Sequence, residues 1–284
     1  MRSLLNSLII GFCFLFFLSP APAQPAMYPW LQDDAVLLTL GDRISPPKGF
    51  EREEVRPASF DFWLQCFPVK SGNPPVMLFD GGKKGNQSAH HLVLDLDVGN
   101  KDLQQCADSV IRLWAEYLYF TGQYNRIHFN FTSGDRADFT RWAEGYRPVV
   151  QGSKVSWVQK GDKGNSYEQF RAYLENVMMY AGSASLSKEM IPVEDIEDIR
   201  AGDVFIQGGF PGHAVIVMDT AVHPKTGEKV FLLAQGFMPA QDMHVLKNLN
   251  HPEISPWYKT DFGQVLSTPE WDFAKTDLKR FPPQ

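Results

Sequence analysis

The stretch that decides the fold runs from residue 202 to residue 246. It contains the segments Gly202-Asp203-Val204-Phe205-Ile206-Gln207, Gly212-His213-Ala214-Val215-Ile216-Val217-Met218-Asp219, Val230-Phe231-Leu232-Leu233-Ala234-Gln235 and Met243-His244-Val245-Leu246. Short apolar runs rich in β-branched residues, separated by Gly and Pro turns, are typical of consecutive antiparallel strands. We therefore predict a four-stranded antiparallel meander in this part of the chain.

Helices are predicted mainly upstream of the meander. The longest is expected from about Lys101 to Phe120, because apolar residues recur there at three- and four-residue steps. Those positions are Leu103, Cys106, Val110, Leu113 and Tyr117. Ser59 is expected to cap a short helix that reaches Cys66, and Ser166 with Gln169 forms a capping-box pattern before a helix that ends near Tyr180.

The remaining expected elements are shorter. They are strands at 36–40, 76–79, 91–98 and 127–131, a helix near 137–144, a variable stretch up to Gly164 and a polar connection over 182–200. Helices that precede a strand meander favour an α+β architecture, with the long helix packed on the antiparallel sheet and an N-terminal embellishment.

The N-terminus predicts export. Arg2 is followed by an apolar run over 8–18 and by an Ala-x-Ala site that ends at Ala23, which is the order of features in a cleavable signal peptide. The run is shorter than the roughly 20 apolar residues of a membrane-spanning helix. We expect residues 1–23 to be removed, leaving 24–284 as a single α+β domain in the periplasm or outside the cell, with no integral membrane segment.

Charge argues against one class of partner. The formal net charge is -6 and no Lys/Arg cluster occurs, so nucleic acid is not expected to bind. Two cysteines remain after processing, Cys66 and Cys106, in a compartment where disulfides persist. Cys106 is open to three interpretations: a buried apolar residue, a nucleophile, or one half of a bridge to Cys66.

The candidate catalytic residues are Cys106, His213 and Gln235. A thiol becomes nucleophilic when a helix N-terminus or an imidazole favours its thiolate. His213, at the start of a strand, would take and return the proton, and Gln235 on the next strand would orient the ring. With a helix beginning at Lys101, however, Cys106 would lie in the second turn, where the effect of the helix dipole is already fading.

Each of these residues also has a structural interpretation. His213 would be a core histidine bonded to a backbone carbonyl, and Gln235 would satisfy backbone groups at a strand end. Arg112 and Glu116, one helical turn apart, are expected to form a solvated pair, although a charge near a cleft could bind a substrate carboxylate. Adjacent histidines on a strand point to opposite faces, so His90-His91 with His128 or His244 do not form a metal cage. No cofactor is implied.

Two resemblances add to these expectations. The segment from Gly202 through Gly212-His213-Ala214 resembles the second half of NlpC-type, papain-like cysteine peptidases, in which the catalytic histidine opens a strand and the nucleophile begins an upstream helix. Those enzymes favour Asp-Cys-Ser/Gly, whereas this chain has Gln104-Gln105-Cys106-Ala107-Asp108. The resemblance implies a papain-like fold and a peptide or peptidoglycan-like substrate.

The second resemblance covers most of the mature chain. The chain is similar to an uncharacterised secreted family of Bacteroidetes-type bacteria that carries only the label domain of unknown function 4846. The shared segments are Pro46-Pro47-Lys48-Gly49-Phe50, Asp102-Leu103-Gln104-Gln105-Cys106-Ala107-Asp108, His128-Phe129-Asn130-Phe131-Thr132-Ser133-Gly134, Gly212-His213-Ala214 and Met238-Pro239-Ala240-Gln241-Asp242-Met243-His244. The expected function is an exported cysteine hydrolase that cleaves an amide; the alternative is a non-catalytic binding or structural module.

Overall fold

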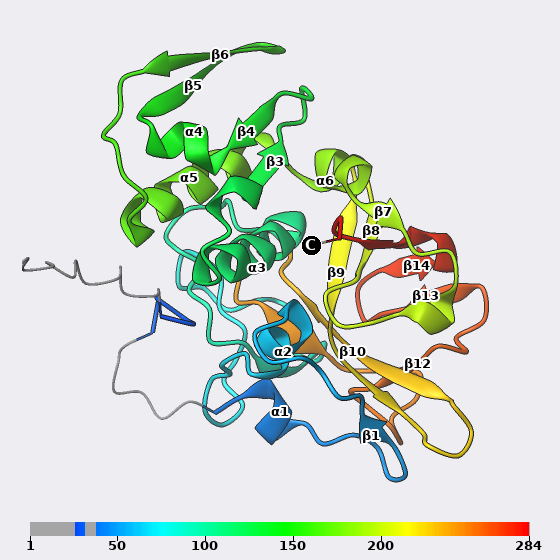
Figure 1. Cartoon of the computed structure of the whole chain (residues 1–284). Helices are drawn as coiled ribbons and strands as arrows, with labels where there is room; N and C mark the ends of the chain where they lie inside the picture. Colours follow the sequence, from blue (N-terminus) through cyan, green and yellow to red (C-terminus); the bar gives the residue numbers. More distant parts are fainter. Residues whose placement is uncertain (1–25, 32–37, 284) are drawn as a thin grey trace, which may run out of the picture.

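A large antiparallel sheet forms the centre of the molecule. The structure is a computed structural model that describes residues 26–31 and 38–283. The strand order is β2-β11-β10-β9-β8-β15-β7, with β1 paired to β9 and β12 paired to β10. Figure 1 shows α3 on one side of β9 and the β13–β14 hairpin on the other side. The fold is therefore mixed, with helices and short hairpins arranged around one sheet.

The helices are α1 (Leu40–Arg43), α2 (Phe60–Gln65), α3 (Cys106–Phe120), α4 (Phe139–Ala143), α5 (Tyr167–Tyr180) and α6 (Ser183–Glu189). The sheet strands are β1 (Glu51–Arg52), β2 (His90–Val93), β7 (Ile191–Pro192), β8 (Val204–Gln207), β9 (His213–Val222), β10 (Lys229–Gln235), β11 (His244–Leu246), β12 (Tyr258–Lys259) and β15 (Leu278–Arg280). Separate two-stranded sheets pair β3 (His128–Asn130) with β4 (Arg136–Asp138), β5 (Tyr146–Gln151) with β6 (Lys154–Gln159), and β13 (Val265–Ser267) with β14 (Asp272–Ala274).

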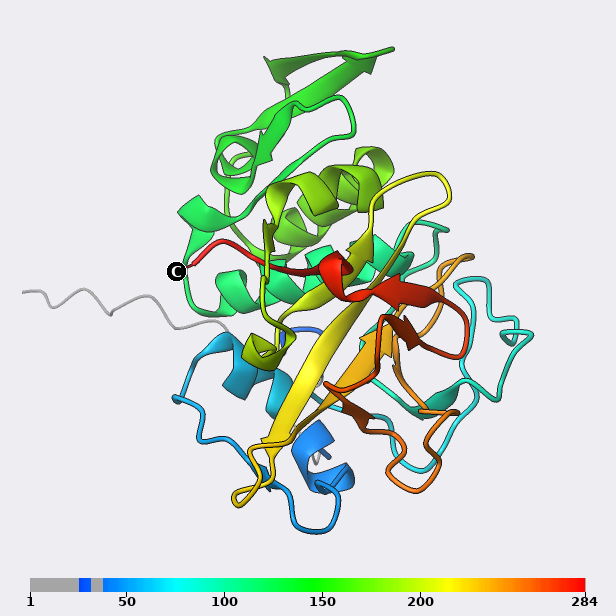
Figure 2. The same cartoon turned by 90° about the vertical axis from the view of Figure 1, so that its right-hand side faces the viewer.

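The sheet is buried on both faces, and the period-2 alternation of its strands assigns each side chain to one of them. In β9, Ala214, Ile216 and Met218 belong to the larger core cluster, which contains α3. Val215 and Val217 belong to a smaller cluster, with Leu266 of β13 and Phe273 of β14. The turned view in Figure 2 shows β9 crossing the molecule with the C-terminal hairpin beside it. Burial on both faces explains the continuous apolar runs seen in the sequence.

The four-stranded meander is confirmed. Strands β8, β9, β10 and β11 are neighbours in the sheet and pair antiparallel in chain order. The other expected strands are shorter or different. β2 ends at Val93, and residues 76–79 make only isolated bridges. Leu40 begins helix α1 instead of ending a strand.

Two predicted helix caps are confirmed. Ser59 accepts from the Phe62 N–H at the start of α2, and Ser166 accepts from the Gln169 N–H at the start of α5. The Gln169 side chain has a different role from the one expected, since its carbonyl accepts from the Arg147 guanidinium. The polar connection over 182–200 contains helix α6, and the variable stretch before Gly164 contains the β5–β6 hairpin, which projects from the body (Figure 1).

The predicted signal peptide, residues 1–23, lies outside the described residues, as does part of the strand expected at 36–40. Within the described ranges 26–31 and 38–283, no helix has the length and apolar character needed to cross a membrane.

Candidate active site

Cys106 is the first residue of α3, which corrects the predicted helix start near Lys101. Residues 101–105 form turns instead, because Gln105 is extended and its N–H donates to the Asp108 carboxyl at 3.2 Å. Asp102 also leaves the helical path, since its Oδ1 accepts from the Ala240 N–H at 2.7 Å. The thiol therefore sits at the N-terminus, where unpaired N–H groups and the helix dipole stabilise negative charge.

The beginning of α3 packs tightly against the end of β10. A Cβ added at Gly236 would lie 2.3 Å from Ser109 Oγ and 2.9 Å from the Gln105 carbonyl oxygen, so only glycine fits there. Burial raises the pKa of the Cys106 thiol, whereas the backbone N–H groups of Ala107 and Ala214 hydrogen-bond the sulfur and lower it. The contact with Ala214 places the sulfur against the residue that follows His213.

His213 and Gln235 lie together, as predicted. The His213 Nε2 and Gln235 Oε1 are 2.9 Å apart, and both side chains are fully buried. The Gln235 Nε2 donates to Glu270 Oε2 at 2.7 Å, which orients the amide so that its oxygen faces the imidazole. His213 must then carry its proton on Nε2, because an amide oxygen only accepts. The other ring nitrogen, Nδ1, is left as an acceptor.

The His213 Nδ1 is buried and has no hydrogen-bond partner among the described residues. Burial of a polar atom without a hydrogen-bond partner costs free energy, so Nδ1 is expected to accept a proton from a group that approaches it during function. Nδ1 is the ring nitrogen closer to the backbone, and Cys106 Sγ lies against the next backbone N–H. The acceptor and the thiol thus approach the same end of β9.

The imidazole and the thiol reach this end from different sides. His213 lies two residues before Val215, so its side chain is on the same face of the sheet as Val215 and Val217, which contact the smaller cluster. Ala214 is on the opposite face, which contacts α3. Among the described residues, no hydrogen bond joins Cys106 to His213. The structure brings His213 and Gln235 into contact and places the Cys106 sulfur against the backbone N–H of Ala214, but it does not show the thiol bonded to the ring.

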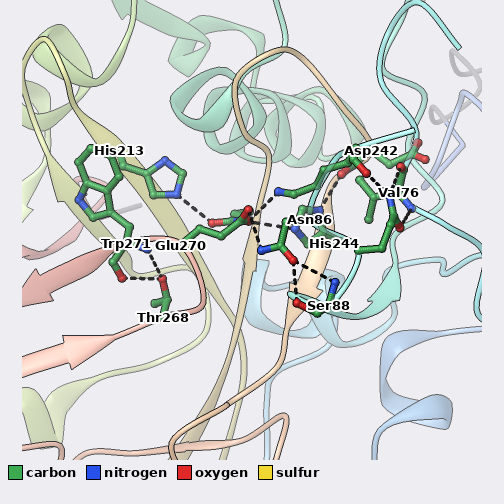
Figure 3. A network of polar contacts seen from close by, with 12 residues as sticks. Val76, Asn86, Ser88, His213, Asp242, His244, Thr268, Glu270 and Trp271 are labelled. Atoms are coloured by element: carbon green, nitrogen blue, oxygen red, sulfur yellow. Dashed lines mark hydrogen bonds and ion pairs between the residues drawn. The ribbon is translucent and has the colours of Figure 1, made fainter. Parts of the chain in front are cut away.

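The surroundings of Gln235 form a cluster that we call the Glu270 cluster. It consists of His213, Gln235, Glu270, Lys84 and His244. Lys84 Nζ donates to Glu270 Oε2 at 2.6 Å, and His244 Nε2 lies 3.4 Å from Gln235 Nε2. In Figure 3, Glu270 lies between His213 on one side and Asn86 and His244 on the other.

Aromatic rings enclose His213. The ring centroids of Phe237, Trp271 and Phe273 lie 5.0, 5.2 and 6.0 Å from that of the imidazole. Burial lowers the pKa of His213 to about 4, although the hydrogen bond that its Nε2–H donates to Gln235 and the charge of Glu270 act in the opposite direction. The imidazole is therefore neutral at physiological pH, which is the form that can accept a proton.

A second buried group, which we call the Arg112 cluster, holds the segment in front of Cys106. It consists of Arg112, Glu116, Asp97, Gln104, Tyr167 and Arg171. Arg112 is 3.3 Å from Glu116, and both are buried, so the prediction of a solvated pair is wrong. Arg112 also donates to Gln104 Oε1 at 2.6 Å and to Asp97 Oδ1 at 2.5 Å. It thereby ties α3 to the loop that leads into it.

The two described cysteines are free, so the interpretation of a Cys66–Cys106 bridge is wrong. Among the described residues, no group of three His, Cys, Asp or Glu side chains is arranged to hold a metal ion. A cavity of about 340 Å³ opens beside Cys106, between the start of α3, the end of α5 and the turn before His213. The nucleophile candidate therefore has an adjacent space that could receive a substrate.

Sequence reasoning missed Glu270, Lys84 and Asp108. Glu270 and Lys84 lie in loops 186 positions apart, and neither belongs to a periodic pattern. Asp108 stands at the third position of α3, and burial raises its pKa to about 8. The only available signal was the position of Asp108, since a carboxyl three residues after an N-cap is a capping pattern.

No curated protein and no solved structure matches the chain. The family model described as Domain of unknown function (4846) matches residues 40–280, a range that includes Cys106, His213, Gln235 and Glu270. Because this match covers most of the sequence, the chain belongs to that family.

Proposed function

We propose that this protein is a thiol hydrolase, a peptidase or amidase that cleaves an amide bond through Cys106, His213 and Gln235. One observation carries the proposal: the neutral His213 has an unpartnered, buried Nδ1, and the backbone N–H of the next residue, Ala214, holds the Cys106 sulfur. The start of a helix, a neutral imidazole and a polar orienting group are the parts that a cysteine nucleophile requires.

In the proposed reaction, the Cys106 thiol transfers its proton to His213 Nδ1 as the sulfur attacks the substrate carbonyl. The imidazolium then returns this proton to the leaving amine, and an acyl-thioester remains on Cys106. Water attacks the thioester with His213 as the base, which releases the acid and restores the thiol. Throughout these steps, the Gln235 carbonyl accepts from the Nε2–H of His213 and keeps the ring oriented.

Burial shapes the resting state of this pair. It raises the pKa of the Cys106 thiol and lowers that of His213, so both groups are neutral before substrate binds. Proton transfer must then accompany attack on the substrate instead of preceding it. Movement of the Cys106 side chain toward Nδ1 is required, which is consistent with the looser geometry of active sites without substrate.

The finer aspects of the proposal rest on resemblance. The antiparallel sheet with α3 packed on it suits a papain-like arrangement, and the likeness of residues 202–216 to NlpC-type peptidases favours a cell-wall peptide as substrate. The predicted signal peptide places this activity in the periplasm or outside the cell. Each of these statements is an analogy between folds and motifs.

The second candidate is a non-catalytic exported module that uses the same cavity for binding. It is favoured by the missing hydrogen bond between Cys106 and His213 and by the burial that raises the thiol pKa. In this alternative, Cys106 packs as a small apolar residue.

The rate of iodoacetamide labelling at Cys106, measured against pH by peptide mass spectrometry, separates the two candidates. A hydrolase should label well below the ordinary thiol pKa of about 8.5, because His213 takes the proton. His213→Ala should slow labelling at pH 6, whereas the control His251→Ala, at an exposed histidine, should not. Labelling that occurs only after unfolding would contradict a catalytic Cys106 and support the binding module.

A further inference from the structure

The cavity beside Cys106 has an exposed apolar rim. Phe210, Met179 and Met238 line it with 86%, 54% and 44% of their surface exposed. The other strongly exposed large apolar residues among those described, Val158, Ile191, Leu249 and Val265, do not line this cavity. Exposed apolar side chains that gather at one concave site mark a binding surface.

The rim residues come from three separate segments. Phe210 lies in the turn between β8 and β9, Met238 in the loop after β10, and Met179 in the last turn of α5. The turn is packed closely, since a Cβ added at Gly212 would lie 2.3 Å from Ser183 Oγ and 2.7 Å from two backbone oxygens. A tightly packed turn holds Phe210 in place, while the two methionines can adapt to the shape of a ligand.

The charge of the cavity excludes one class of ligand. Its charged side chains are Asp102 and Asp108, and no Lys or Arg lines it. Asp102 Oδ1 accepts from Ala240 N–H and Gln105 Nε2–H, whereas Oδ2 has no partner among the described residues. Asp108 Oδ1 is likewise buried and unpartnered. A substrate carboxylate would therefore meet the like charge of Asp102, with no cation to compensate it. Asp108, whose pKa burial raises to about 8, is mostly uncharged at neutral pH.

We propose that the substrate of Cys106 carries a large apolar side chain, and no carboxylate, next to the scissile carbonyl. This inference rests on the proposed function and narrows its substrate class from peptides in general to apolar acyl groups. Under this proposal, peptides with an acidic residue at the scissile carbonyl are not substrates. The rim supplies the contact with the apolar side chain, and the charge of Asp102 rejects anionic residues.

The test compares two chloromethyl ketone probes at Cys106 of the folded protein, N-acetyl-leucine chloromethyl ketone and N-acetyl-glutamate chloromethyl ketone. In both probes the side chain lies on the acyl side of the ketone that takes the place of the scissile carbonyl. Labelling is quantified by peptide mass spectrometry, and each rate is divided by the rate of the same probe with glutathione. We expect the leucine probe to react at least about tenfold faster, since burial of one leucine side chain has a free energy of about 1.5–3 kcal/mol.

Variants identify the origin of the preference. Met179→Gln and Phe210→Ser should each lower the ratio of the two rates about threefold, because they remove exposed apolar contacts. Leu249→Gln, a matched control with 56% exposure outside the cavity, should leave it unchanged. Asp102→Asn should raise the glutamate rate alone, since the amide keeps the Oδ1 acceptor and removes the charge.

The outcomes separate the two proposals. Equal normalised rates for the two probes, or an equal fall of the ratio in Leu249→Gln, would overturn the apolar substrate class while leaving a reactive Cys106. A Cys106 that reacts with neither probe, nor with iodoacetamide, until the protein unfolds would overturn the proposed function and this inference with it.

Discussion

The Arg112 cluster and the Glu270 cluster are both buried polar groups, but they place their charges differently. Arg112 carries a permanent charge at the centre of its cluster, and Glu116 and Asp97 surround it. In the Glu270 cluster, the ion pair with Lys84 lies at one end, and two neutral side chains, Gln235 and His213, lead away from it. The first arrangement suits a structural role, in which α3 is held to the loop before it, and the second keeps a neutral imidazole available as a base.

The largest expected effect is on the Arg112 cluster. Arg112→Met should lower the free energy of unfolding by about 3–5 kcal/mol, because it leaves the fully buried carboxyl group of Glu116 without its nearest cation. Urea unfolding measures this loss. The control Lys101→Met removes an exposed ion pair with Glu175, with 56% and 44% side-chain exposure, and should cost less than about 1 kcal/mol. Similar losses of unfolding free energy in the two variants would show that Arg112 does not stabilise the fold more than an exposed ion pair does.

The next effect concerns pH. Burial lowers the pKa of His244 to about 3 and that of His213 to about 4. Both values lie below the value of 6.5 that applies to an unfolded chain, so the unfolded state takes up protons first. The stabilising contribution of each histidine is complete above pH 6.5 and is lost as the pH falls toward its folded pKa.

His244→Asn isolates one of these contributions, because the Asn amide can still donate to the Asp242 carbonyl that accepts from His244 Nδ1. Between pH 7 and pH 5, the variant should lose about 2 kcal/mol less stability than the natural chain. Glu189 and Asp108, whose pKa values burial raises to about 7 and about 8, act in the opposite sense in both proteins. Parallel stability curves for the two proteins would contradict a neutral buried His244.

A smaller effect is expected at the charged end of the Glu270 cluster. Glu270→Gln keeps an acceptor for Gln235 but removes the negative charge that favours protonated His213. Iodoacetamide labelling of Cys106 at pH 6 should slow by up to about tenfold, equivalent to one pKa unit. Glu168→Gln, at an exposed glutamate, serves as the control. An unchanged rate would mean that Glu270 only supports the fold.

The smallest effect is expected at Asp108. Its ionisation raises the pKa of the Cys106 thiol, and its own pKa is raised to about 8 by burial. Asp108→Asn should therefore speed labelling about two- to threefold at pH 9, where the carboxyl is charged, and leave it unchanged at pH 6. A uniform change at both pH values would indicate displacement of the helix start instead of a charge effect. Asp135→Asn, at an aspartate in the β3–β4 turn, controls for general effects.

Local pattern was enough to predict the meander and two helix caps. Apolar runs between Gly and Pro turns define β8 to β11, and hydroxyl groups at Ser59 and Ser166 define two helix starts. The same reasoning failed for the β5–β6 hairpin and α6. The hairpin has no fully buried face, so its residues do not show a core-facing alternation. α6 is a short, serine-rich helix without a clear apolar repeat.

The sequence by itself determined the order of strands β8 to β11 and the pair His213–Gln235, because both depend on strands that follow one another along the chain. Tertiary structure alone decided that α3 begins at Cys106. The apolar period extends back to Leu103, but two contacts hold residues 101–105 in turns. One is with Ala240, which is remote in sequence, and the other is with Arg112, which lies in the second turn of the helix. Glu270 and Lys84 could not be predicted for the same reason. An ion pair between two loops that are distant in sequence produces no periodic pattern, and only the tertiary fold brings the two side chains together.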